Sequence, residues 1–151
     1  MSARPLDFAS FDSPPEASVL AVDTGLDQYN LSVAPLSEVR RLATFATDSS
    51  GHVVGGAVGR TWGRCCELLQ LWVEPDRRST GVGSRLLRQF EEHAARRGCN
   101  VFYLTTLSFQ APNFYRKHGY ESLAEISGYP DGIIKYLMHK TVVQPDPLPP
   151  P

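Results

Sequence analysis

The sequence has few of the residues from which disulfide, metal and redox sites are built. It contains three cysteines in 151 residues, two of them adjacent at Cys65 and Cys66 and the third at Cys99. This number and spacing fit neither a disulfide framework nor a zinc site. A catalytic cysteine would need a histidine and an orienting group nearby, and the pattern indicates neither. We therefore expect three small buried apolar residues and no bound metal.

The sequence also lacks a strong net charge and a long apolar run. Its formal net charge is −1, which gives no general attraction to nucleic acid or to an anionic membrane. The apolar runs are much shorter than a membrane span, and the first residues show no signal-peptide pattern. With 151 residues and 42% hydrophobic content, the chain suffices for one core. We expect one cytoplasmic domain over residues 1–143 and a disordered proline-rich tail over residues 144–151.

Periodicity and turn residues predict the order of the secondary structure elements. We expect helices at 16–30, 85–97 and 112–118, and strands at 42–47, 53–59, 66–73, 101–107, 120–127 and 133–141. The first three strands form an antiparallel meander, in which Gly55 and Gly56 indicate a bulge or a close approach. The nearly continuous apolar run at 101–107 is typical of a central strand covered on both faces. The fold class is therefore α/β (α+β), with a mixed, mainly antiparallel sheet of six to seven strands flanked by helices.

The junction between the strand at 66–73 and the helix at 85–97 is suited to an anionic phosphate. It reads Arg-Arg-Ser-Thr-Gly-Val-Gly-Ser from Arg77 to Ser84. A helix start leaves N–H groups unpaired and carries partial positive charge, while glycine allows a ligand close to the backbone. The third small residue of a dinucleotide-binding loop is missing, and no Gly-Lys-Ser/Thr tripeptide occurs for nucleotide hydrolysis.

Two blocks of sequence are similar to one family. Arg78-x-x-Gly81-x-Gly83 resembles the acetyl-coenzyme A pyrophosphate loop of the GNAT superfamily of N-acetyltransferases. The run from Ser108 to Tyr120 resembles the family's Asn-x-x-Ala-x-x-Phe-Tyr-x-x-x-Gly-Phe/Tyr motif, one helix and one strand downstream. Ser108 stands where the family often has asparagine. The resemblance extends over roughly residues 42–138.

The resemblance implies the GNAT fold, in which the strands on either side of the loop and its helix splay apart. It also implies acetyl-coenzyme A as cosubstrate, without a metal. The residues expected to bind the coenzyme are Leu71, Trp72, Val73, Arg78, Ser79, Thr80, Gly81, Val82, Gly83, Ser84, Ser108, Asn113 and Tyr115.

Acetyl transfer to an amine needs a base for the ammonium proton and an acid for the departing thiolate. Glu67 is the candidate base, because it shares a strand face with Leu69, Leu71 and Val73 and lies eleven residues before Arg78, where the family can place a glutamate. The alternative is a strand-end glutamate that reaches solvent. Tyr115 is the candidate acid by its place in the Phe-Tyr pair, and the alternative is a tyrosine that packs the short helix on the sheet.

Two functions fit these residues. One is an N-acetyltransferase that acts on a primary amine, and the other is a non-catalytic domain that binds an acyl-coenzyme A for regulation. Glu67 and Tyr115 together favour the enzyme. The amine could belong to a small molecule or to a peptide, no nucleic-acid or membrane partner is expected, and a homodimer is possible.

Overall fold

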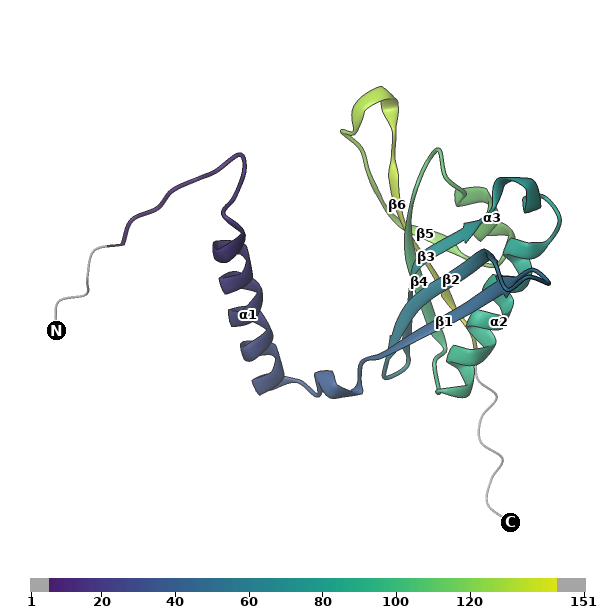
Figure 1. Ribbon diagram of the computed structural model, residues 1–151, viewed down its shortest axis with the longest axis horizontal. Coiled ribbons are helices and arrows are strands. Elements are labelled where there is room, and N and C mark those ends of the chain that lie inside the picture. Colours follow the sequence, from purple (N-terminus) through teal and green to yellow (C-terminus); the bar gives the residue numbers. More distant parts are fainter. Residues whose placement is uncertain (1–5, 144–151) are drawn as a thin grey trace, which may run out of the picture. The chain divides into compact units, whose positions relative to one another are not determined.

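The computed structural model describes residues 6–143 (Figure 1). The chain divides between Ser37 and Glu38 into two compact units. The first contains helix α1 (Glu16–Val33), none of whose residues is buried. The predicted helix at 16–30 is therefore confirmed and runs three residues further. The single domain over residues 1–143 stays a prediction, and the tail expected at 144–151 lies outside the described residues.

The second unit is built on a six-stranded sheet with the order β1-β2-β3-β4-β6-β5. Only the β3–β4 pair is parallel, so the mixed, mainly antiparallel sheet predicted from the sequence is confirmed. The strands are β1 (Arg40–Thr47), β2 (Val53–Trp62), β3 (Cys65–Val73), β4 (Val101–Leu107), β5 (Glu121–Ile126) and β6 (Lys135–Thr141). The helices of this unit are α2 (Val82–Arg96) and α3 (Pro112–Lys117), with single 3₁₀ turns at Pro75–Arg77 and Pro130–Gly132. A further 3₁₀ turn, Leu36–Glu38, spans the division between the two units.

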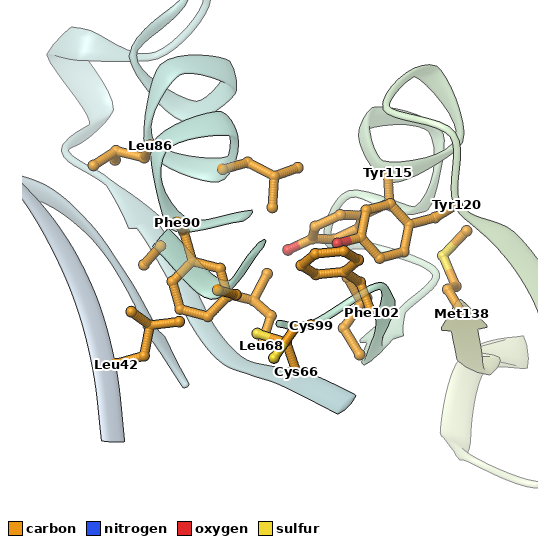
Figure 2. Packing of buried hydrophobic residues seen from close by; sticks show 14 residues of the cluster. Leu42, Cys66, Leu68, Leu86, Phe90, Cys99, Phe102, Tyr115, Tyr120 and Met138 are labelled. Atoms are coloured by element: carbon orange, nitrogen blue, oxygen red, sulfur yellow. The ribbon is translucent and has the colours of Figure 1, made fainter. Parts of the chain in front are cut away.

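Helix α2 covers one face of the sheet and carries most of the helical part of the core (Figures 1 and 2). Its buried residues recur at helical spacing: Leu86, Leu87, Phe90 and Ala94. They pack against buried strand residues that include Leu42, Ala57, Leu68 and Leu104. The helix begins at Val82, three residues before the predicted start, because Gly81 takes the left-handed conformation at its N-cap (φ 85°).

Two sequence expectations about burial need correction. Cys66 and Cys99 are buried as expected, but Cys65 is exposed because it lies one residue from Cys66 and so on the other face of β3. Strand β4 is central, yet it is not covered on both faces. Phe102, Leu104 and Thr106 are buried and the alternate residues are not, so one face of β4 meets the core.

A β-bulge lies in the middle of the β2–β3 pair. The register runs from Val58 opposite Gln70 to Gly59 opposite Leu68, so Leu69 is the extra residue. A Cβ on Gly59 would overlap the carbonyl oxygen of Glu67 and lie 2.7 Å from the Phe90 ring. The bulge is thus at Gly59 rather than at Gly55 or Gly56, although a Cβ on Gly56 would also lie 2.8 Å from the Phe45 ring.

Strands β3 and β4 separate halfway along their length. They pair in register from Cys65 with Val101 to Leu68 with Leu104. Beyond that point β3 continues to Val73 and β4 to Leu107 without a further pair in the register. The splay implied by the family resemblance is therefore present.

Candidate active site

A cleft of about 910 Å³ opens where β3 and β4 separate. The ends of both strands, part of the β1–β2 hairpin and one residue of α3 line it. From β3 come Leu68, Leu69, Gln70, Leu71, Trp72 and Val73, and the remaining lining residues are Phe45, Val53, Gly56, Val58, Arg78, Leu104, Thr105, Thr106, Phe109, Gln110, Ala111 and Tyr115. Five of the predicted coenzyme-binding residues are thus in this wall: Leu71, Trp72, Val73, Arg78 and Tyr115.

The loop before α2 offers a row of backbone donors beside this cleft. The first helical hydrogen bond of α2 runs from the N–H of Arg85 to the carbonyl of Gly81. Among the described residues, none accepts a hydrogen bond from the N–H groups between Ser79 and Ser84. The Nε of Arg78 donates to the Val73 carbonyl at 2.9 Å, which fixes the loop to the end of β3. Six unpaired donors at a helix N-terminus form a site for a phosphate group.

Gly83 lies in the first turn of α2 and faces the end of β3. A Cβ placed there would lie 3.7 Å from both the Phe114 ring and Val73, which is ordinary van der Waals contact. The free protein therefore has room for a methyl group at this position. A larger side chain would have to displace Phe114 or Val73, or turn away from them.

Tyr115 lies in α3 and is 8% exposed. Its ring makes edge-on contacts with Phe114 at 5.2 Å and with Tyr120 at 5.8 Å between ring centroids. Burial raises the pKa of the Tyr115 hydroxyl to about 12, so the phenol keeps its proton near neutral pH. No described residue hydrogen-bonds this hydroxyl, while the residue itself lines the cleft. It can therefore donate a hydrogen bond to a group bound there.

Glu67 lies on β3 one residue before the strands separate, and it is not part of the cleft wall. Both Nε and an Nη of Arg60 contact the Glu67 carboxylate at 2.7 Å. The Glu67 side chain is 22% exposed. The expectation that Glu67 shares a face with Leu71 and Val73 is wrong. The extra residue Leu69 reverses the alternation of the strand, so Leu71 and Val73 pack against the core while Glu67 does not.

Ser108 and Asn113 lie outside the cleft wall and have local partners. The Ser108 N–H donates to the Ile134 carbonyl at 2.8 Å, and the Ser108 hydroxyl accepts from the Ile134 N–H at 3.1 Å. The Asn113 side-chain oxygen accepts from Arg116 at 2.8 Å. These contacts hold the two segments in place, and coenzyme binding by either residue stays a prediction.

Sequence reasoning missed the part of the cleft wall formed by the end of β4 and the segment after it. The residues are Thr105, Thr106, Phe109, Gln110 and Ala111. Gln110 turns its side chain back to accept from the N–H of Leu107 at 2.8 Å, which ends the strand. The signal was available, since a segment after one of two separating strands must border the gap between them.

His118, at the end of α3, contacts α2. Its Nε2 lies 3.0 Å from the hydroxyl of Ser84 in the first turn of α2. Its ring also contacts Phe114, at 4.7 Å between centroids. The end of α3 is thus tied to the loop that carries the free N–H groups.

The fold matches that of known acetyltransferases. The model of the family described as "Acetyltransferase (GNAT) family" matches residues 11–120. The chain therefore belongs to the GNAT acetyltransferase family. It is an acetyltransferase with acetyl-coenzyme A as cosubstrate, and the separated strands and the free N–H groups of its loop fit that cosubstrate.

Individual relatives agree with this assignment. The chain is 38% identical over 110 residues to blasticidin-S acetyltransferase from Streptomyces morookaense, covering 70% of this chain and 81% of the relative. An acetyltransferase from Agrobacterium fabrum is 27% identical over 127 residues, with 84% and 93% covered. A crystal structure of an acetyltransferase from Bacillus cereus matches with a TM-score of 0.75 and 26% identity, covering 89% of this chain and 98% of that one.

No helix among residues 6–143 combines the length and the apolar character needed to cross a membrane.

Proposed function

We propose that this protein transfers the acetyl group of acetyl-coenzyme A directly to the primary amine of a small molecule, with Glu67 as base and Tyr115 as acid. The observation that carries the proposal is the cleft between the separated strands β3 and β4. One end of it adjoins the unpaired N–H groups before α2, and its wall includes the buried phenol of Tyr115.

The coenzyme pyrophosphate binds to the N–H groups from Ser79 to Ser84, since the N–H of Arg78 already donates to the Pro75 carbonyl at 3.2 Å. These groups belong to the start of α2, where the helix dipole favours negative charge. The Arg78 guanidinium lines the cleft and adds formal positive charge. The pantetheine arm then lies in the gap between β3 and β4, so that the thioester comes close to Tyr115.

Each proton in the reaction has a defined destination. Glu67 accepts a proton from the ammonium group, and the neutral nitrogen forms a bond to the thioester carbon. The nitrogen, now positively charged, gives its second proton to water, and the carbon–sulfur bond breaks. The departing thiolate takes the phenolic proton of Tyr115, and the phenolate is reprotonated from solvent. The apolar surroundings that raise the pKa of this phenol also disfavour a free thiolate, which brings donor and acceptor closer in basicity.

The amine acceptor is a small molecule of the antibiotic type. The 38% identity to a blasticidin-S acetyltransferase, which covers 81% of that relative, supports this part of the proposal. Three partly exposed aromatic side chains in the cleft wall, Phe45, Trp72 and Phe109, supply flat apolar surfaces suited to a ring system. Blasticidin S is therefore the first acceptor to test.

The test is a thiol-release assay with acetyl-coenzyme A and a panel of amines that includes blasticidin S, polyamines, amino acids and peptides. Tyr115→Phe keeps the ring contacts and removes the hydroxyl. We expect turnover to fall by about tenfold to ten-thousandfold, with coenzyme affinity unchanged. Glu67→Gln should lower the rate by about a hundredfold or more and flatten the acidic limb of the pH profile. Transfer at the original rate by either variant would remove that residue from the mechanism.

Coenzyme placement needs a separate measurement. Gly83→Leu places a bulky side chain in the first turn of α2 and should abolish coenzyme binding in calorimetry. Gly83→Ala is the matched control, because its methyl group meets only ordinary contacts at 3.7 Å. Full affinity in the leucine variant would show that the pyrophosphate lies elsewhere.

A further inference from the structure

A row of polar residues crosses the whole sheet in register. The paired positions, taken from β1 to β5 across the sheet, are Arg41, Arg60, Glu67, Tyr103, His139 and Glu121. We call this set the polar row. Its members come from positions 41 to 139 of the chain and meet only through strand pairing.

The polar row lies on the face of the sheet opposite α2. Its chain neighbours Leu42, Cys66, Phe102 and Met138 are all buried in the core that α2 covers. Successive residues of a strand point to opposite faces, so the row points away from that core. Directly paired positions bring Cβ atoms to about 5 Å, close enough for their side chains to interact.

Tyr103 occupies the middle of the row. It is paired with Glu67 on one side and with His139 on the other. Burial raises the pKa of the Tyr103 phenol, and the negative charge of Glu67 raises it further, while Arg60 acts in the opposite direction. The phenol therefore keeps its proton near neutral pH and can donate one hydrogen bond and accept another.

We propose that Glu67, Tyr103 and His139 form a proton relay that carries the amine proton to solvent. The proposal rests on the proposed function, in which Glu67 is the base. After Glu67 has taken a proton from the ammonium group, it passes this proton to the Tyr103 oxygen as the phenolic proton moves to the His139 ring. His139 then releases a proton to water, and all three groups return to their starting states.

Charged neighbours support this direction of transfer. Arg60 contacts the Glu67 carboxylate at 2.7 Å from the β2 side, and Tyr103 on β4 is the residue paired with Glu67 on its other side. On the far side of the row, Glu121 is paired with His139 from the edge strand β5 and can stabilise the imidazolium that forms. Arg41 is paired with Arg60 at the other end and does not face the three relay groups.

The relay can be tested by removing its members one at a time. With an identified amine, Tyr103→Phe should lower kcat by about tenfold to a hundredfold while coenzyme affinity stays unchanged. His139→Ala should lower kcat as well, and added imidazole should restore it in proportion to its concentration. Tyr136→Phe and His93→Gln are the matched controls: Tyr136 packs against the core, His93 belongs to α2, and both should keep the original rate and show no imidazole effect.

A second measurement follows the contact itself without turnover. Titration of ¹³C-labelled tyrosine by NMR, with Tyr103 assigned from its phenylalanine variant, should show that Glu67→Gln lowers the pKa of the Tyr103 phenol. An unchanged titration would overturn the relay, as would transfer at the original rate by Tyr103→Phe. If Glu67→Gln transfers at the wild-type rate, or the wild-type protein acetylates no amine, the proposed mechanism fails first and the relay with it. Loss of activity in Glu67→Gln but not in Tyr103→Phe leaves the base in place and removes only the relay.

Discussion

Gly59→Ala should disrupt the sheet more than any ordinary glycine-to-alanine change. Gly59 is the residue of β2 that faces the bulge in β3, and its Cα lies against the backbone of Glu67. The added Cβ would overlap the Glu67 carbonyl oxygen and lie 2.7 Å from the Phe90 ring. Phe90 is 1% exposed, so it cannot move aside without disturbing the core.

The expected loss of stability follows from two opposing contributions to the free energy of unfolding. An alanine that fits its site stabilises a protein by about 0.4–1 kcal/mol relative to glycine, because the unfolded chain loses freedom. Overpacking a core by one carbon costs about 1–3 kcal/mol when side chains can adjust. Here one of the two contacts is with backbone, so the bulge itself must shift. We therefore expect the free energy of unfolding to fall by about 3 kcal/mol or more.

Urea denaturation followed by circular dichroism measures this loss, and Gly83→Ala is the control with the same added methyl group. The methyl group added in Gly83→Ala makes only ordinary van der Waals contacts, and alanine is a better helix former than glycine. The stability of that variant should therefore be unchanged or higher by up to about 1 kcal/mol. If the free energy of unfolding of Gly59→Ala lies within about 1 kcal/mol of the wild-type value, the strands around the bulge are not paired as the structure shows.

Three further outcomes follow from other sites. Above pH 9 stability should fall, because burial raises the Cys66 pKa from 9.0 to about 12 and only the unfolded thiol ionises in that window. Measured by urea unfolding, the decrease in the free energy of unfolding should approach about 4 kcal/mol at pH 12. In Cys66→Ala the free energy of unfolding should depend less on pH in this range. Lys140→Met leaves the Glu91 carboxylate, 16% exposed and 2.6 Å from the lysine, without its cation, and should lower stability by about 3 kcal/mol. A Glu91→Gln/Lys140→Met double variant should lose less than the sum of the two single changes. Hydrogen bonds from Ser50 and His52 lower the pKa of Asp48, so its carboxylate stabilises the folded state at neutral pH. Asp48→Ala should therefore lower Tm at neutral pH. The difference in Tm between this variant and the wild type should disappear as the pH falls below the ordinary carboxyl pKa of 3.8.

Local sequence patterns could predict those elements whose residues face a single core. In α2, apolar residues recur at helical spacing, and the same residues are buried in the structure. Strand β4 was predicted with the bounds that it has, 101–107. The loop before α2 could be recognised too, because its glycines, its arginines and the following helix are contiguous in the chain.

Pairing between strands could not be predicted in this way. The bulge at Leu69 depends on how β2 and β3 align, and it reverses the side-chain alternation that placed Glu67 on the same face as Leu71. The polar row likewise needs the register of five strand pairs. For α1, periodicity predicts the helix, yet none of its apolar residues is buried, so the pattern indicated a helix without indicating what it packs against.

The bulge at Leu69 also divides β3 into two parts with different tasks. Before it, Glu67 lies in the polar row on the face opposite α2 and is within one residue of the point where the strands separate. After it, Leu71 and Val73 pack toward the core, and the Val73 carbonyl accepts the hydrogen bond that fixes Arg78 and the loop. An unbulged strand would put Glu67 and Val73 on one face, because they are an even number of residues apart. The extra residue therefore lets a single strand hold the proposed base on one face of the sheet and pack Leu71 and Val73 into the core on the other, next to the loop proposed to bind the coenzyme.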